Sequence, residues 1–242
     1  MDRSKVKNAR DKVRNNAAFV RNTAQCTEIG DTATTDEDLP HCVEHPLAGV
    51  VVLREFADET LLGDALESVV IAAPPRHMAL PRGRRMAVAT TSCGDTGWVA
   101  DTRGYRYSDV DPLSGDPWPP MPACFSELSR KAAEFAGFQA FEADTCLVNR
   151  YAPGVGMGAH QDRDERDFSQ PIVSVSLGLP ARFFVVGAER KGRSTPIDLK
   201  SGDVLVFGGT ARRYYHGVRP VKPGQHPRFG CCRWNLTFRR AR

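Results

Sequence analysis

Residues 145–165 read TCLVNRYAPGVGMGAHQDRDE, and this stretch carries the most informative pattern in the chain. His160 and Asp162 are two residues apart, and in an extended strand such residues point to the same face. An imidazole nitrogen and a carboxylate oxygen can therefore meet at one point. Two histidines and one carboxylate form the ligand set that leaves open positions on non-haem Fe(II). Because a His-x-Asp triplet also occurs by chance in surface loops, the pair needs further support.

That support comes from residues 233–239, RWNLTFR, which alternate between polar and apolar side chains. The alternation predicts a strand with one apolar face and one polar face, the latter carrying Arg233, Asn235, Thr237 and Arg239. A solvated outer strand has the same pattern. Two guanidiniums on one face also suit a dicarboxylate, however, because guanidinium binds carboxylate in a bidentate manner. Iron ligands beside a dicarboxylate site would make an oxygenase that depends on iron and 2-oxoglutarate.

Several ordered motifs resemble the AlkB family of 2-oxoglutarate-dependent nucleic-acid demethylases. They are NRYAPG at 149–154, HQDRDE at 160–165, IVSVSLG at 172–178 and the strand at 233–239, and the likeness covers roughly residues 48–240. The resemblance implies that the same three residues bind Fe(II) and carry out catalysis, namely His160, Asp162 and His216. It implies that 2-oxoglutarate is held by Asn149, Tyr151, Arg233, Asn235 and Arg239.

The resemblance also implies a DNA-repair reaction on N-alkylated bases such as 1-methyladenine and 3-methylcytosine, with RNA as a further substrate. The methyl group would be hydroxylated with O₂ and released as formaldehyde, while 2-oxoglutarate is decarboxylated. Contacts to the damaged nucleotide are implied for Trp98, Tyr105, Arg106, Tyr107, Asp164 and Arg190. An enzyme that acts on a base must hold it out of the stack by aromatic contact, although isolated aromatic residues more often belong to a core.

Two alternatives remain open. One is the same oxygenase chemistry on tRNA or on a protein. The other is a metal-bearing jelly-roll protein without enzymatic activity, since zinc also accepts His and carboxylate ligands. The two arginines of the last strand argue against the second alternative. Trp98 with Tyr105 favours repair of an alkylated base over the first alternative. Leu80 and Arg84 stand where bacterial members of the family tend to carry Thr and Tyr, which leaves the preferred strand and substrate open.

The composition of the first 45 residues differs from that of the rest. Residues 1–27 hold seven Lys or Arg and two Asp, whereas residues 28–45 hold six acidic residues and no Lys or Arg. Neither segment can bury much apolar surface, so we predict a disordered or weakly ordered extension over residues 1–45. Residues 46–242 then form one dioxygenase domain, a size that suits a single core.

Within that domain we predict a mainly β fold with flanking helices at 58–73 and 123–136. Many short strands separated by Gly, Pro or charged turns indicate a jelly roll, or double-stranded β-helix, with its core at about 145–240. An Arg-rich and aromatic segment at about 76–118 is predicted to form a nucleotide-recognition lid. The predicted strands lie near 49–56, 145–151, 171–178, 182–187, 196–199, 203–207, 213–217 and 231–239.

Cysteine usage and hydropathy bear on location and partners. The seven cysteines lack zinc-type spacing, and no secretory segment precedes them, so free thiols in a reducing cytoplasm are expected. No apolar run approaches the ~20 residues of a membrane span. The expected partner is alkylated DNA, preferably single-stranded, or RNA, and the expected state is a monomer with no membrane contact. A net charge of +4 does not by itself require a nucleic-acid partner.

Overall fold

A computed structural model of the chain describes residues 42–80 and 83–242. In this part there are two α-helices, α1 (Glu59–Ala72) and α2 (Ala123–Phe135), and a short 3-10 helix, η3 (Gly209–Ala211). The strands are β1 (Cys42–Leu47), β2 (Val50–Arg54), β3 (Ala89–Gly94), β4 (Gly97–Asp101), β5 (Gly104–Ser108), β6 (Thr145–Tyr151), β7 (Met157–His160), β8 (Ile172–Gly178), β9 (Ala181–Gly187), β10 (Thr195–Leu199), β11 (Val204–Phe207), β12 (Tyr215–Val218) and β13 (Arg233–Arg239).

Local sequence signals account for both helices. Asp58 caps α1, since its carboxylate accepts hydrogen bonds from the backbone N–H groups of Thr60 and Leu61 at 2.8 and 3.0 Å. α2 is followed by Gly137, whose φ of 87° lies in the left-handed region that glycine adopts most readily. Both predicted helices are confirmed within one residue at each end, and the strands predicted after residue 145 are confirmed with shifts of one or two residues.

Five of the described strands were not predicted: β1, β3, β4, β5 and β7. β7 (MGAH) is short and lacks apolar alternation, and β1 (CVEHPL) contains Pro46. β1 is the edge strand of its sheet, a position that tolerates proline. It begins at Cys42, inside the segment predicted as an N-terminal extension. Residues 1–41 of that segment lie outside the described residues, so its disorder stays a prediction.

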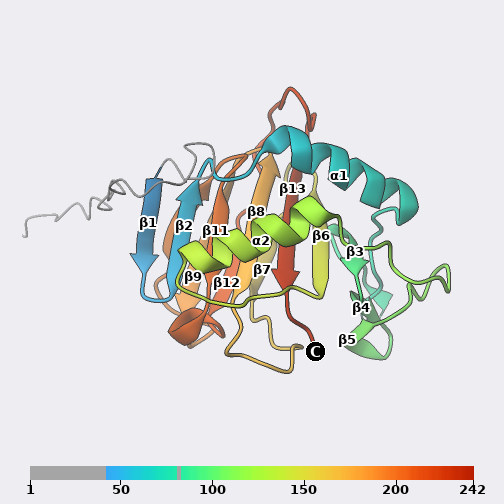
Figure 1. The fold of residues 1–242 in the computed structure, drawn as a ribbon, viewed down its shortest axis with the longest axis horizontal. Helices are drawn as coiled ribbons and strands as arrows, with labels where there is room; N and C mark the ends of the chain where they lie inside the picture. The colour runs from blue at the N-terminus through green and yellow to red at the C-terminus, as the bar shows by residue number, and fades with distance from the viewer. Residues whose placement is uncertain (1–41, 81–82) are drawn as a thin grey trace, which may run out of the picture.

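The strands form two facing sheets, as Figure 1 shows, with the order β1-β2-β11-β8-β13-β6-β3 in the larger sheet and β10-β9-β12-β7 in the smaller. Helices α1 and α2 cover one face of the larger sheet, and the smaller sheet lies behind its other face (Figure 1). One apolar core fills the space under the helices, around Leu66, Phe125 and Leu236. A second core lies between the sheets, around Ile172 and Leu205. The predicted jelly-roll class with flanking helices is therefore confirmed.

β13 shows how the alternation of one strand positions a site. It pairs with β8 on one side and β6 on the other. Leu236 and Phe238 pack in the core under the helices, while Arg233, Asn235 and Arg239 line a cavity between the two sheets. The polar face predicted from the sequence is therefore not a solvated outer face. It is the inner wall of a cavity.

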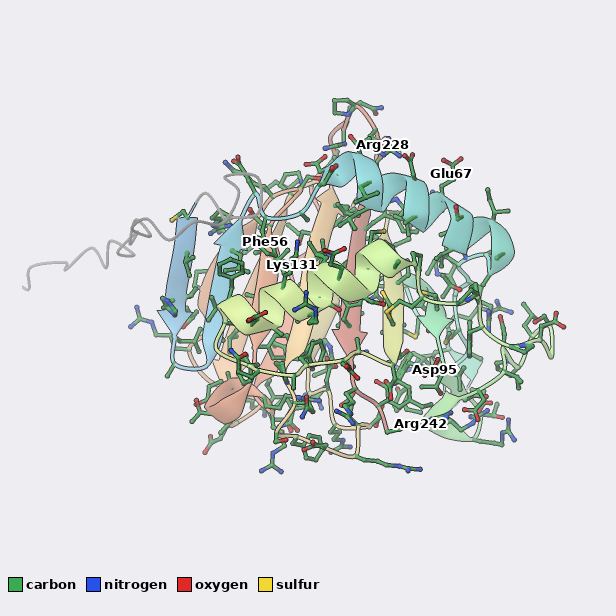
Figure 2. All side chains as sticks on the ribbon, viewed as in Figure 1. Phe56, Glu67, Asp95, Lys131, Arg228 and Arg242 are labelled. Atoms are coloured by element: carbon green, nitrogen blue, oxygen red, sulfur yellow. The ribbon has the colours of Figure 1, made fainter. Side chains whose placement is uncertain are left out.

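β4 and β5 pair with each other alone and form a two-stranded hairpin, residues 97–108, that we call the lid hairpin. The end of the chain lies close to it (Figure 2), since Arg242 pairs with Asp109, which directly follows β5. The carboxylate of Asp144 accepts hydrogen bonds from the backbone N–H groups of Ala241 and Arg242 at 2.7 and 3.0 Å. Side-chain contacts thus fasten the chain end that follows β13.

Five of the cysteines that the structure describes, Cys93, Cys124, Cys146, Cys231 and Cys232, are free. Cys42 is disulfide-bonded, so the expectation of free thiols was wrong at that position. Among the described residues, the helices are too short or too polar for any of them to span a lipid bilayer.

Candidate active site

The pairing of β7 with β12 brings three potential metal ligands together. His160, at the end of β7, and His216, in β12, are directly opposite Cα partners, and their ring centres are 4.5 Å apart. Asp162 follows two residues after His160, and its carboxylate oxygens lie 3.6 Å from Nε2 of His160 and 3.9 Å from Nε2 of His216. The potential ligand atoms of the three residues all lie within 4.8 Å of one another.

The route by which Asp162 reaches this point differs from the prediction. We expected His160 and Asp162 to share one face of a continuous strand, but β7 ends at His160 and Asp162 lies in the irregular segment that follows. The convergence therefore depends on the pairing of β7 with β12 and on contacts that hold this segment. The spacing singled out two residues that do converge, although not because they share the face of one strand.

Both imidazole rings are oriented by backbone carbonyls. Nδ1 of His160 lies 2.9 Å from the carbonyl oxygen of Gly158, and Nδ1 of His216 lies 2.9 Å from that of Tyr214. An Nδ1–H that donates to a carbonyl leaves Nε2 with its lone pair free, which is the usual arrangement of a metal-bound histidine. Both Nε2 atoms face Asp162, so the donor set of two imidazoles and one carboxylate fits a divalent metal with open positions.

The charge states of the group also suit a metal ion. Burial alone would raise the pKa of Asp162, but the guanidinium of Arg239 and the two imidazoles outweigh it and hold this pKa well below its ordinary value. Burial lowers the pKa of His216 to about 4, although Asp162 opposes the shift. An ionised carboxylate and a neutral imidazole are the forms that bind metals.

A second feature of the cavity is an unpaired buried cation. Arg233 is 1% exposed, and its Nη2 donates to the hydroxyl of Ser176 at 3.0 Å. Its Nε and Nη1 atoms have no hydrogen-bond partner among the described residues. Burial lowers the pKa of Arg233. Because an isolated buried charge is costly unless it is paired, an anionic ligand is the natural partner for this guanidinium.

The other residues predicted to hold the dicarboxylate surround Arg233. Arg233 faces Tyr151 and Asn235 faces Asn149 as Cα partners between β13 and β6. Asn149 Oδ1 is buried without a hydrogen-bond partner in the described part of the chain. The amide of Asn235, in contrast, donates to the hydroxyl of Ser174 and to the carbonyl of Val175, at 2.8 and 2.9 Å. The unpaired nitrogen donors of Arg233 fit a carboxylate of a dicarboxylate ligand, whereas Asn149 Oδ1 is an acceptor and offers it no hydrogen bond.

Arg239 links this region to the metal ligands. Its Nη2 donates to Oδ2 of Asp162 at 2.7 Å, and the side chains of both residues are at most 10% exposed. The cavity that contains all these groups has a volume of about 640 Å³, which is large enough for a small co-substrate together with part of a larger molecule. We refer to it as the central cavity.

The lid hairpin contributes aromatic side chains to the central cavity. The rings of Trp98 and Tyr105 are stacked, with centres 5.4 Å apart and an interplanar angle of 13°. Nε1 of Trp98 donates to Oδ2 of Asp164 at 2.8 Å. These three residues and Arg190 line the cavity, as does Leu80, which was noted from the sequence as unusual.

Two residues predicted to contact substrate do not line the central cavity. Arg106 pairs with Asp101 inside the lid hairpin, at 2.8 Å. Tyr107 points at Glu165, and its hydroxyl donates to Oε1 of that residue at 2.5 Å. In the described structure their side chains are therefore engaged with protein groups.

Sequence reasoning missed a buried ion pair behind the site. Glu165 and Arg212 have side chains only 2% and 3% exposed, and their Oε2 and Nη2 atoms are 3.0 Å apart. Glu165 lies in the charged run 162–167, a pattern that normally indicates a solvated turn, and no sequence feature marks Arg212. The one available signal was that Glu165 falls within the HQDRDE motif.

Comparison with known proteins agrees with this geometry. Residues 49–239 match the family model for the 2OG-Fe(II) oxygenase superfamily. The α-ketoglutarate-dependent dioxygenase AlkB of Escherichia coli is 48% identical over 202 residues, which is 82% of this chain and 93% of that protein. The DNA N(6)-methyladenine demethylase ALKBH1C of Arabidopsis thaliana is 31% identical over 173 residues, 61% of this chain and 38% of that protein. The solved structure of OsALKBH1 has a TM-score of 0.72 at 27% identity and covers 82% of this chain and 99% of that chain.

Proposed function

The chain belongs to the AlkB family of Fe(II)- and 2-oxoglutarate-dependent oxygenases, and from this premise we propose that it repairs alkylated nucleic-acid bases by oxidative demethylation. Its cofactors are Fe(II), 2-oxoglutarate and O₂. The observation that carries the proposal is the combination, within one cavity, of a His-Asp-His cluster, an unpaired buried guanidinium and a stacked aromatic pair. The first two suit the cofactors, and the third suits a base.

We assign His160, Asp162 and His216 as the ligands of Fe(II) and as the catalytic centre. When bound, Fe(II), 2-oxoglutarate and O₂ supply an oxidation in which the co-substrate loses CO₂ to become succinate and one oxygen atom enters a methyl C–H bond. The protein contributes the orientation of both imidazoles, through the carbonyl oxygens of Gly158 and Tyr214, and an ionised carboxylate. A hydroxylated N-methyl group then expels formaldehyde, and the base nitrogen recovers its proton or lone pair.

The two arginines of β13 have separate tasks in this proposal. Arg233 binds the carboxylate of 2-oxoglutarate that is remote from the metal, because its Nε and Nη1 atoms are buried without partners. Arg239 stands at the metal end of the co-substrate, since it already contacts Asp162. Tyr151, Asn149 and Asn235 complete the site from the same two paired strands.

The substrate base is held by the lid hairpin. Trp98 and Tyr105 offer aromatic faces at the cavity, and stacking of this kind is worth ~1–3 kcal/mol per base. Asp164 lines the same cavity and places a carboxylate beside the base. Arg190 lines the same cavity and is assigned to the substrate. Arg106 and Tyr107 support the lid hairpin instead, because both bind protein groups.

We also propose a preferred form of nucleic acid, an oligomeric state and a cellular location. A base must leave the stack before it can enter the cavity, and this step costs least in single-stranded nucleic acid, which we propose as the preferred substrate. We also propose a monomer, because one chain supplies the His-Asp-His cluster, the unpaired guanidinium and the aromatic pair together. Five of the six described cysteines are free, which supports a reducing compartment, the cytoplasm, as its location, although Cys42 is disulfide-bonded.

The proposal is tested by product analysis. The full chain would be incubated with Fe(II), 2-oxoglutarate and single-stranded oligonucleotides that carry one 1-methyladenine or 3-methylcytosine. We expect equal amounts of formaldehyde and of restored base, together with succinate. Succinate without formaldehyde on any methylated DNA or RNA would overturn the demethylase proposal while leaving the oxygenase class intact.

A further inference from the structure

Four buried charges lie next to one another behind the candidate metal ligands. Glu165 pairs with Arg212 at 3.0 Å, and Asp162 pairs with Arg239 at 2.7 Å. The two pairs are joined, because Nε of Arg239 lies 3.4 Å from Oε1 of Glu165. Two positive and two negative charges thus balance one another away from water, the condition under which buried charges are tolerated. We call these four residues the charge cluster.

All three nitrogen atoms of the Arg212 guanidinium bind the segment that carries Asp162. Its Nε donates to the carbonyl oxygen of Gln170 and its Nη1 to the carbonyl oxygen of Asp162, both at 2.9 Å, while its Nη2 binds Glu165. Residues 161–171 contain no helix or strand. Since regular backbone pairing does not hold this segment, its position depends on such side-chain anchors.

The charge cluster also contacts the lid hairpin, through a single residue. The hydroxyl of Tyr107, in β5, donates to Oε1 of Glu165 at 2.5 Å. That oxygen is the one that faces Arg239. The lid hairpin makes a second hydrogen bond to the same segment, from Trp98 to Asp164, but Asp164 is exposed and makes no ion pair with Arg212 or Arg239. Only the Tyr107 contact therefore leads to the charge cluster.

We propose that Glu165 and Arg212 are positioning residues that couple the seating of the lid hairpin, through Tyr107, to the placement of Asp162 and Arg239. The inference rests on the proposed function, in which Asp162 binds the metal and Arg239 the co-substrate. With Tyr107 seated, Glu165 has a hydroxyl donor as well as its arginine partners. When Tyr107 moves away, the buried carboxylate of Glu165 loses this hydrogen bond. It then attracts the guanidinium of Arg239 more strongly, because an under-bonded buried charge is costly.

A consequence of this coupling is that the co-substrate and the lid hairpin stabilise each other. A contact that favours binding of 2-oxoglutarate when the lid hairpin is seated must, by linkage, favour seating when 2-oxoglutarate is bound. The charge cluster would then allow the co-substrate site to reach its full affinity only beneath a closed lid. Such an arrangement matches the need to exclude water from the reacting groups.

The test is the affinity of 2-oxoglutarate for the full chain loaded with Mn(II), measured by titration calorimetry without nucleic acid. Tyr107→Phe removes one hydroxyl and keeps the ring, so we expect the Kd to rise about tenfold, which is ~1.4 kcal/mol. Glu165→Gln removes the carboxylate that holds both Arg212 and Arg239, so it should weaken binding to a similar degree. In the Glu165→Gln background, Tyr107→Phe should add less than about twofold, because residues that act through one another are not additive.

Trp98→Phe provides the matched control. It removes the other hydrogen bond between the lid hairpin and the 161–171 segment but leaves the charge cluster untouched. We expect its Kd for 2-oxoglutarate to change by less than about twofold. Thermal unfolding of every variant establishes that the fold is retained, and if Glu165→Gln does not fold, the comparison of Tyr107→Phe with Trp98→Phe decides alone.

Two results would overturn the inference. One is an unchanged Kd in Tyr107→Phe, and the other is an equal loss in Tyr107→Phe and Trp98→Phe, which would show that any loosening of the lid hairpin has the same effect. Failure of the wild-type chain to bind 2-oxoglutarate would instead overturn the proposed site itself. The two kinds of failure are therefore distinguishable in one experiment.

Discussion

The guanidinium carbon of Arg233 lies 5.2 Å from the centre of the Tyr151 ring, and no carboxylate in the described part of the chain pairs with it. A planar cation that packs on an aromatic face and keeps two nitrogen atoms unpaired is arranged for a bidentate anion. This arrangement supports the proposal that Arg233 binds a carboxylate of the co-substrate.

Arg233→Lys should therefore raise the KM for 2-oxoglutarate by about tenfold or more, since a lysine offers a point charge in place of a fork of donors. Arg239→Lys should do the same and should also lower kcat, because Arg239 contacts Asp162. The measurement is succinate formation at varied 2-oxoglutarate. Arg182→Lys, in an exposed pair with Asp198, is the control and should behave as wild type. Wild-type constants in both site variants would place the co-substrate elsewhere.

His216→Ala and Asp162→Ala should each abolish turnover. Asp162→Ala should also lower the stability of the fold. The buried guanidinium of Arg239 would lose its partner at 2.7 Å and keep only Glu165, at 3.4 Å. Breaking a buried pair in this way costs ~3–5 kcal/mol, whereas Asp162→Asn retains an acceptor and should cost less. Urea unfolding of the two Asp162 variants measures the difference. Iron-dependent turnover in His216→Ala or Asp162→Ala would refute the ligand assignment.

Asp164→Asn should reduce repair of cationic lesions much more than repair of neutral ones. 1-Methyladenine and 3-methylcytosine carry a positive charge at neutral pH, and 1-methylguanine and 3-methylthymine do not, so a carboxylate in a partly dry cavity favours the former. The asparagine keeps an acceptor for Nε1 of Trp98, which leaves the lid contact in place. The ratios of kcat/KM, mutant over wild type, are compared on oligonucleotides that differ only in the lesion. Equal ratios would mean that Asp164 supports the loop and does not sense charge.

A chain that begins at Cys42 should turn over a methylated trinucleotide as the full chain does, since none of the proposed site residues precedes β6 except those of the lid hairpin. A chain that begins at Leu47 should be less stable. It lacks β1, which would expose the edge of β2, and it lacks Glu44, whose carboxylate binds Arg54 at 2.8 Å. The unfolding temperature and kcat of the two truncated chains test this, and a large loss of kcat in the longer one would show that residues 1–41 complete the site.

The sequence alone determined the elements with strong local signals. The N-cap Asp58 and the glycine after residue 136 marked the helices, and strict alternation in residues 233–239 assigned the two faces of β13. The same local motifs, read through a family resemblance, identified the three metal-binding candidates that the structure brings together. These signals succeed because helix caps and strand faces depend on neighbours a few residues away in the chain.

Only the tertiary structure decided which polar side chains are buried and what they contact. Glu165 belongs to a charged run that indicates a solvated turn, yet its partners Tyr107 and Arg212 are 58 and 47 residues away in the sequence and remove it from water. Likewise, Asp162 meets His216 because β7 pairs with β12, and not because a strand continues past His160. The burial of a charge depends on long-range partners that compensate its desolvation, and such partners leave no periodic trace in the local sequence.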